Sequence, residues 1–98
     1  MTDYVFDWDP AKAEANLRKH GISFVAATKA FDDPWHQSEM DRIEGGEYRW
    51  KTIGQINGTV FLLVAHTYRD HDQGIVVRII SAGKANREER KRYDRQDG

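Results

Sequence analysis

The chain has 98 residues, of which 39% are hydrophobic and 32% charged, and its net charge is -1 at pH 7. This length suffices for one hydrophobic core but not for two ordinary domains, so we expect a single domain over residues 1–98. The absence of cysteine excludes disulfides, thiolate metal sites and a cysteine nucleophile. No apolar run is long enough to span a membrane and the N-terminus does not resemble a signal peptide, so we expect a cytoplasmic protein.

The first predicted elements are a short strand and a helix. In the segment YVFDW (4–8), aromatic residues alternate with others, which is typical of a strand with one buried face. The next segment, DPAKAEANLRKHG (9–21), has clear helix boundaries. Asp9 can cap the helix, Pro10 fits its first position, and Gly21 can adopt the left-handed conformation that ends it.

A second helix is predicted over residues 24–31, where apolar residues recur at helical spacing. Ser23 can cap its start, and Pro34 ends it. The segment 32–46 is rich in turn residues and has little periodicity, so we interpret it as a loop. Residues 31–47 carry six acidic side chains against one arginine, which makes this region strongly acidic.

Three strands and a helix are predicted in the second half of the chain. Strands at 48–57 and 59–69 are joined by an Asn-Gly pair at 57–58, which favours a two-residue type I′ hairpin because both positions tolerate positive φ. Residues 75–82 are rich in β-branched side chains and form the last strand. Asn86, with a glutamate three residues later, starts the final helix. The order βααβββα predicts an α+β fold with helices around a small, mainly antiparallel sheet.

The expected strand register brings three polar side chains into one row. A two-residue turn between the first pair of these strands places Arg49 opposite His66 on one face. A following hairpin that pairs Arg69 with Ile75 places Arg78 opposite His66 from the other side. The sequence therefore predicts Arg49, His66 and Arg78 side by side across three strands.

This predicted row suits an anion. Two guanidiniums beside an imidazole repel one another, and a phosphate would relieve that repulsion. The last segment adds to the positive charge, because residues 84–98 carry six basic side chains against four acidic ones. The alternative interpretation is a sheet edge with solvated arginines that pair with Glu47 or Asp70.

Five segments resemble, in order and spacing, the BrnT family of bacterial toxins: FDWDPAKAEANLRKHGISF, FDDP, EYRWKTIG, VAHTYR and VRIISAGKANREERKRY. The family belongs to type II toxin–antitoxin systems and is similar in fold to RelE-type ribonucleases. The resemblance implies a toxin that cleaves RNA and slows translation, neutralised by a BrnA-like, ribbon-helix-helix antitoxin. It implies that operator DNA is bound only through the antitoxin, and it is compatible with a toxin–antitoxin heterotetramer. The chain departs from the family pattern at Gly83, where a basic residue is common.

In a ribonuclease, this row of side chains would take part in RNA cleavage. Metal-independent RNA cleavage needs attack of the ribose 2′-OH on its neighbouring phosphate, neutralisation of the developing charge, and two proton transfers. We expect Arg49 and Arg78 to bind phosphate oxygens through their guanidinium forks, and His66 to act as general acid or base. No cofactor is expected, because the four histidines lack the spacing of metal ligands.

Other residues are expected to hold the RNA: Lys12, Arg69, Ser81, Lys84, Arg87 and Tyr93. Lys84 and Arg87 lie where the last strand meets the last helix, and Tyr93 could stack on a base or pack inside the protein. We interpret His20 as structural, since a cation at a helix C-terminus is favourable without any further role. Trp35 either packs on its own loop or contacts the antitoxin or a second copy. The alternative function is a non-catalytic protein that binds nucleic acid or the antitoxin.

Overall fold

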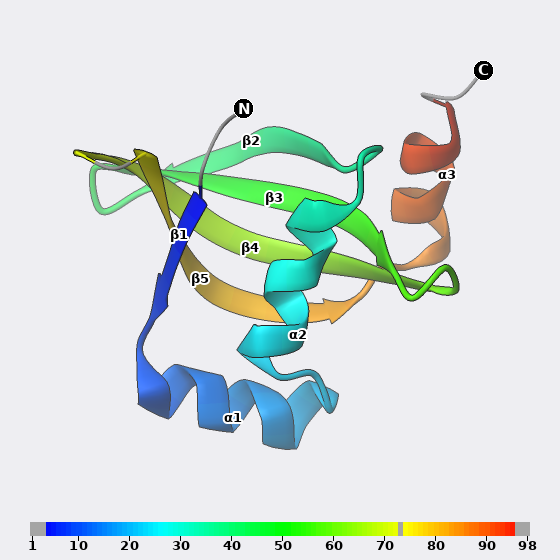
Figure 1. Cartoon of the computed structure of the whole chain (residues 1–98), viewed down its shortest axis with the longest axis horizontal. Helices are drawn as coiled ribbons and strands as arrows, with labels where there is room; N and C mark the ends of the chain where they lie inside the picture. Colours follow the sequence, from blue (N-terminus) through cyan, green and yellow to red (C-terminus); the bar gives the residue numbers. More distant parts are fainter. Residues whose placement is uncertain (1–3, 73, 96–98) are drawn as a thin grey trace.

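Five strands form one sheet in the order β1-β5-β4-β3-β2, as seen in a computed structural model that describes residues 4–72 and 74–95 (Figure 1). β1 runs parallel to β5, and every other neighbouring pair is antiparallel. The elements are, in chain order, β1 (Tyr4–Trp8), α1 (Pro10–His20), α2 (Phe24–Thr28), the 3-10 helix η1 (Lys29–Asp32), β2 (Gln37–Glu44), β3 (Glu47–Ile56), β4 (Val60–His71), β5 (Gly74–Lys84) and α3 (Arg87–Arg95). The predicted α+β class is confirmed.

The helix boundaries follow the capping residues of the sequence. The Asp9 side chain accepts a hydrogen bond from the backbone N–H of Ala11 at 2.9 Å, and Gly21 ends α1 with a left-handed φ of 71°. At the start of α3, Asn86 and Glu89 form the predicted reciprocal capping box, with N···O distances of 2.7 and 2.9 Å. Each bond satisfies a backbone donor that a helix start would otherwise leave unpaired.

One predicted loop is a strand. The acidic segment contains β2, which pairs antiparallel with β3 and has a bulge between Met40 and Arg42. Almost all of its side chains are exposed, so no apolar alternation marks it in the sequence. Backbone pairing with β3 holds residues 37–44 in a strand. The interpretation of this part of the segment as a loop is therefore wrong.

The predicted register between β3 and β4 is also wrong, by one residue. Asn57 and Gly58 have φ values of 52° and 70°, as a type I′ turn requires, and the N–H of Thr59 donates to the Ile56 carbonyl at 3.2 Å. However, Ile56 pairs in the sheet with Val60, so Thr59 is an extra residue in the connection. Side chains alternate along a strand, so with this single insertion every β3 side chain lies on the opposite face, relative to β4, from the one that was predicted.

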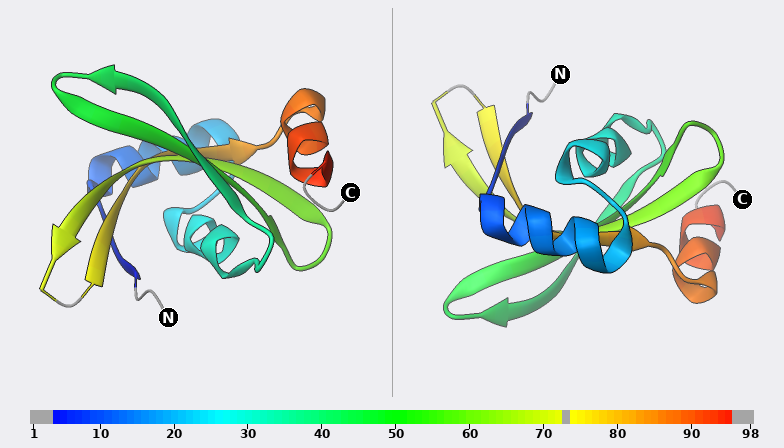
Figure 2. Two further views of the ribbon diagram at one scale, coloured as in Figure 1. Left: turned by 90° about the horizontal axis from the view of Figure 1, so that it is seen from above. Right: turned by 90° about the horizontal axis from the view of Figure 1, so that it is seen from below.

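The hydrophobic core lies between one face of the sheet and the pair α2 and η1, which cross it (Figures 1 and 2). These two helices contribute Phe24, Ala27, Ala30 and Phe31. Leu62 and Val64 of β4 and Val77 and Ile79 of β5 meet them from the sheet. α1 lies along the β5 edge, and α3 stands at the end of the sheet (Figure 2). None of the helices in the described part of the chain is long and apolar enough to cross a membrane.

Asn16 of α1 completes the edge of β5. β1 ends with the pair Trp8 and Ile79, so the next part of β5 has no neighbouring strand on that side. The buried Asn16 amide takes the place of one: its Nδ2 donates to the Ala82 carbonyl at 2.8 Å, and its Oδ1 accepts from the Ala82 N–H at 3.1 Å. Nδ2 also donates to the carbonyl of Ile22 at 3.0 Å.

We therefore expect Asn16→Ala to lower the free energy of unfolding by about 2–4 kcal/mol, because it leaves buried backbone groups without partners. Urea denaturation followed by circular dichroism measures this loss. Leu17→Ala, at an exposed neighbouring position of α1, serves as the control and should change stability little. Equal losses for the two variants would contradict the proposed role of the amide.

Candidate functional site

Basic and polar side chains gather on the sheet face opposite α2. Thr67 of β4 pairs with Arg78 of β5, which in turn pairs with Asp7 of β1. The ladder between β3 and β4 ends at the pair Trp50 and His66, so Arg49 is the next residue of β3 and Thr67 the next of β4. By strand alternation, Arg49, Thr67 and Arg78 point to the same face. We call these three residues the arginine row.

His66 is not part of this row. It pairs with Trp50 and Ile79, faces the helices and is 0% exposed. Its Nε2 lies 2.6 Å from the Thr52 hydroxyl, which lies 2.6 Å from the hydroxyl of Ser38. The predicted placement of His66 beside the arginines is wrong for two reasons. The extra residue at Thr59 shifts β3 against β4 by one residue, and β5 is shifted by one as well, because Ile75 pairs with Asp70 and not, as predicted, with Arg69. A side chain without solvent contact cannot reach an RNA on the surface.

Burial has a direct effect on the charge of His66. Burial, the main cause, lowers its pKa from 6.5 to about 4; the nearby His36 lowers it further, and the Thr67 backbone opposes the shift. Charging an imidazole inside an apolar core costs free energy, so the folded protein keeps the neutral ring near pH 7. The neutral ring packs edge to face on Phe31 and Tyr68.

This lowered pKa predicts a loss of stability in mild acid. Above pH 6.5 neither the folded nor the unfolded state protonates His66, and stability is at its full value. As the pH falls from 6.5 to about 4, only the unfolded state takes up the proton, so the free energy of unfolding decreases by about 3 kcal/mol. Urea denaturation at a series of pH values between 7.5 and 4.5 measures the slope.

The controls for this measurement are two substitutions of histidine. His66→Gln should be less stable at pH 7 but should lack most of the acid-dependent loss, since no group at that position titrates. His20→Gln makes the same substitution at an exposed position of α1 and controls for the loss of a histidine outside the core. An unchanged acid slope in His66→Gln would assign the loss to other groups.

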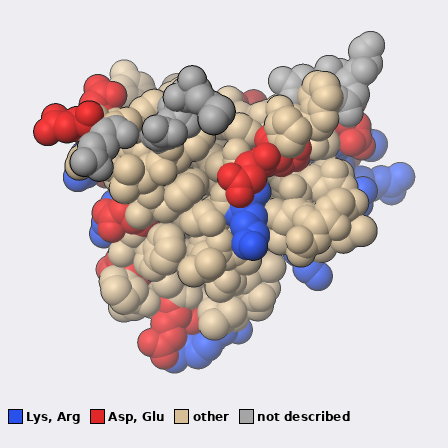
Figure 3. Space-filling view, in the orientation of Figure 1, with Lys and Arg blue, Asp and Glu red and all other residues tan. Residues whose placement is uncertain are grey.

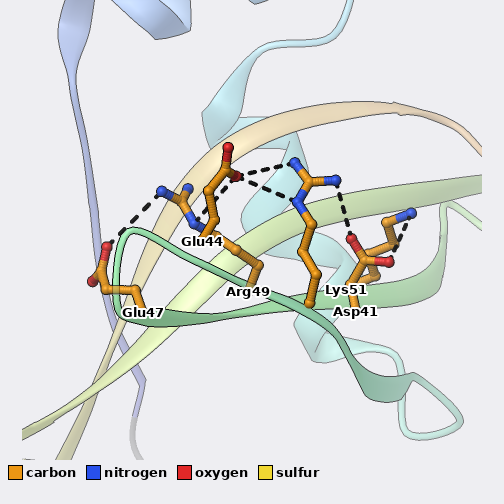
Figure 4. A network of polar contacts seen from close by, with 6 residues as sticks. Asp41, Glu44, Glu47, Arg49 and Lys51 are labelled. Carbon is orange, nitrogen blue, oxygen red and sulfur yellow. Dashed lines mark hydrogen bonds and ion pairs between the residues drawn. The ribbon is translucent and has the colours of Figure 1, made fainter.

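Carboxylates surround the basic side chains on this face (Figure 4). Arg49 lies 3.9 Å from Glu44 and 4.0 Å from Glu47, and Glu47 also contacts Arg69 at 3.7 Å. Arg78 forms a short ion pair with Asp7. These contacts agree with the alternative interpretation of the sequence, in which arginines at the sheet edge pair with Glu47. An anion that binds the arginine row has to compete with these carboxylates.

Two polar atoms at the centre of the row have no hydrogen-bond partner. Within the described residues, Arg49 Nε and Thr67 Oγ1 are buried without one, although the Arg49 side chain as a whole is 25% exposed. An unsatisfied buried donor costs about 1–3 kcal/mol. The side chains of Arg49 and Arg78 are 25% and 42% exposed, so an oxyanion on this face can reach both. The row is for this reason the best candidate for an anion site among the residues that the structure describes.

The other residues predicted to bind RNA are spread over the surface. Arg69 and Ser81 point to the same face as the row, whereas Lys84 pairs with Leu62 and points to the other face. Lys12 is exposed on α1, and Arg87 is exposed at the start of α3. The structure thus brings Arg69 and Ser81 close to the row but not Lys84.

Tyr93 is a packing residue. It is 5% exposed, its ring packs edge to face on Phe61, and its hydroxyl donates to Asp33 Oδ2 at 2.7 Å. The expectation that Tyr93 contacts RNA is contradicted by this burial, and the alternative of internal packing is confirmed.

Asp33 has a structural role that was not predicted from the sequence. Its carboxylate accepts hydrogen bonds from the Gln55 and Trp35 N–H groups and from Tyr93, and so ties α3 to β3. Burial alone would raise the pKa of Asp33, but these hydrogen bonds outweigh it and lower the pKa. The FDDP motif was the available signal, because an aspartate before a turn proline often accepts backbone N–H groups.

Metal-ligating side chains do not converge in the described part of the chain: no group of three His, Asp or Glu residues there could hold an ion.

Comparisons with known proteins assign the chain to a family. The family model of the BrnT ribonuclease toxins of type II toxin–antitoxin systems matches residues 8–89. The fold is similar to that in the 1.1 Å crystal structure of the Brucella abortus ribonuclease toxin BrnT, with a TM-score of 0.59 and 22% sequence identity over 88% of this chain and 100% of that one. No curated protein sequence matches the chain. The family match covers most of the chain, which therefore belongs to the BrnT family of ribonuclease toxins of type II toxin–antitoxin systems.

Proposed function

We propose that the protein is a metal-independent endoribonuclease whose substrate phosphate binds at the arginine row. The observation that supports this site is the pair of strand arginines, Arg49 and Arg78, on one open sheet face with Thr67 between them. Guanidinium groups bind phosphate oxygens in a fixed, bidentate geometry, and they can stabilise the charge that develops when the ribose 2′-OH attacks.

In this proposal carboxylates take over the proton transfer that the sequence analysis gave to His66. Glu47 lies beside Arg49, and Asp7 contacts Arg78. When a phosphate displaces one of these carboxylates from its arginine, that carboxylate becomes available to accept the 2′-OH proton. Comparing the cleavage rates of Glu47→Gln and Asp7→Asn identifies the acceptor, since only its replacement should reduce the rate strongly. If both substitutions reduce the cleavage rate equally and only slightly, charge stabilisation by the arginines is the main contribution to catalysis.

RNA contacts outside the row are proposed for Arg69, Ser81, Lys84, Arg87 and Lys12, which track the phosphate backbone by charge rather than by sequence. We further propose a ribbon-helix-helix antitoxin as the cognate partner, through which alone the complex binds operator DNA.

The direct test is incubation of the purified protein with a long RNA, with and without a chelator. Fragments that form equally in both conditions support metal-independent cleavage, and their 2′,3′-cyclic phosphate ends would identify attack by the 2′-OH. Fragments that form only without chelator would contradict the proposed mechanism. Intact RNA retained on the protein would support the alternative, a non-catalytic nucleic-acid-binding protein.

A further inference from the structure

The two hairpins of the sheet diverge at the end farthest from α3 (Figure 2). Side chains from both hairpins line a cleft at this end. β2 and β3 form one wall, and β4 and β5 with β1 form the other. The cleft has a volume of about 900 Å³. Its apolar lining consists of Tyr4, Met40, Tyr48, Trp50, Tyr68 and Ile75. We call it the interhairpin cleft.

The apolar side chains at this end are only partly covered, and α2 and η1 cross the middle of the sheet (Figure 1). Met40 pairs with Trp50 and Ile43 with Tyr48, so all four point to the same face. Tyr48 is 59% exposed, and Met40 and Ile43 are also exposed. A group of large exposed apolar side chains around a hollow is typical of an interaction site.

The charges around the cleft favour a protein over RNA as its occupant. Glu47 and Asp70 contribute carboxylates to the rim. Among the described residues that line the cleft, the one cation is Arg69, which pairs with Glu47 at 3.7 Å. Acidic groups and uncharged surface both appear at this end of the sheet in Figure 3. A peptide with an apolar side chain beside a lysine or arginine would match both the apolar lining and these carboxylates.

The cleft is also connected to the arginine row. Glu47 lines the cleft and lies 4.0 Å from Arg49 and 3.7 Å from Arg69. A cation that enters the cleft and pairs with Glu47 would therefore be placed next to Arg49. Its positive charge would repel that guanidinium, and the chain that carries it would obstruct the approach of RNA to this end of the row.

We propose that the interhairpin cleft is the docking site of the cognate antitoxin, which inserts a segment with a large apolar side chain next to a lysine or arginine. This inference rests on the proposed ribonuclease function, because it explains neutralisation by access to Arg49. Tyr48 is the anchor of the interface, since exposed aromatic residues that become buried contribute much of the binding energy at such sites.

The test uses the full chain and the tagged protein encoded by the neighbouring reading frame, co-expressed as the antitoxin probe. We expect Tyr48→Asp to weaken binding of this probe by roughly 30-fold or more, as measured by titration of the purified proteins. RNA cleavage by the isolated variant should stay near the wild-type rate. In cells, Tyr48→Asp should arrest growth even when the probe is present.

The matched control is Val25→Asp on α2, which introduces the same charge at a position that is 60% exposed and outside the cleft. It should bind the probe as wild type does. If Tyr48→Asp lowers the unfolding temperature, Tyr48→Ala replaces it, with the same expected loss of binding. Unchanged binding of the probe by the Tyr48 variant would overturn the proposal. A wild-type dimer that Tyr48→Asp dissociates, without any effect on probe binding, would also overturn it, because a second copy of the chain would then occupy the cleft. Loss of probe binding together with an absence of RNA cleavage by wild type would retain the docking site and refute the ribonuclease site.

Discussion

Replacing either arginine of the row by alanine should reduce RNA cleavage by about 100-fold or more without unfolding the protein. Arg49 and Arg78 are the strand cations that flank Thr67, and both are partly exposed. Removing a preorganised donor from the developing charge of a transition state typically costs about 2.7–4 kcal/mol, which corresponds to this factor. Single-turnover cleavage of a labelled RNA measures the effect at the chemical step.

Two further substitutions separate position from charge. Arg78→Lys keeps the positive charge but loses the planar fork, so we expect an intermediate rate, roughly 10-fold below wild type. Arg18→Ala removes a cation from the exposed surface of α1, where it pairs with Glu14, and should leave the rate unchanged. Full cleavage by both Arg49→Ala and Arg78→Ala, with normal unfolding curves, would exclude the row as the catalytic site.

Gly54→Ala should strongly destabilise the fold. A Cβ at Gly54 would lie 2.2 Å from the carbonyl oxygen of Ala30 and 2.9 Å from its carbonyl carbon. Both atoms belong to the backbone of η1, so relief requires that η1 move away from β3 and that the packing of Phe31 be disturbed. We expect a loss of at least about 3 kcal/mol, a large part of the stability of a small domain.

The measurement is thermal unfolding, in which this loss corresponds to a fall of roughly 12–24 °C in Tm for a chain of this size. Gly83→Ala is the matched control: its Cβ would meet only the His20 ring, at 3.8 and 3.9 Å, which are ordinary contacts. Near-equal Tm values for Gly54→Ala and Gly83→Ala would show that η1 yields easily, and would contradict a tightly packed contact between η1 and β3.

The positions of the helices were available from the sequence because local chemistry decides them. Asp9 and Gly21 bound α1 as predicted, and the capping box at Asn86 forms as predicted, since each depends on hydrogen bonds within a few residues. The family resemblance was likewise visible in ordered local motifs, and the family match confirms it.

Strand β2 was missed for a physical reason. The bulge between Met40 and Arg42 interrupts the alternation, so that Met40 and Ile43 share a face although they are three residues apart. What holds the strand is a ladder to β3 and ion pairs such as Lys51 with Asp41 at 3.4 Å. Partners distant in sequence therefore decide the structure of this segment, and no local pattern records them.

The sequence by itself determined the α+β class, the helix boundaries, the turn conformation at Asn57 and Gly58, and the presence of arginines on the strands. Only the tertiary structure decided which side chains share a face. Thr59 adds one residue to the hairpin connection, which takes Arg49 off the core face to which His66 points. The pairing of Thr67 with Arg78 in β4 and β5 likewise places Arg78 on the open face. The burial of apolar surface by the whole sheet selects between two registers that differ by one residue, and the sequence near the turn is compatible with both.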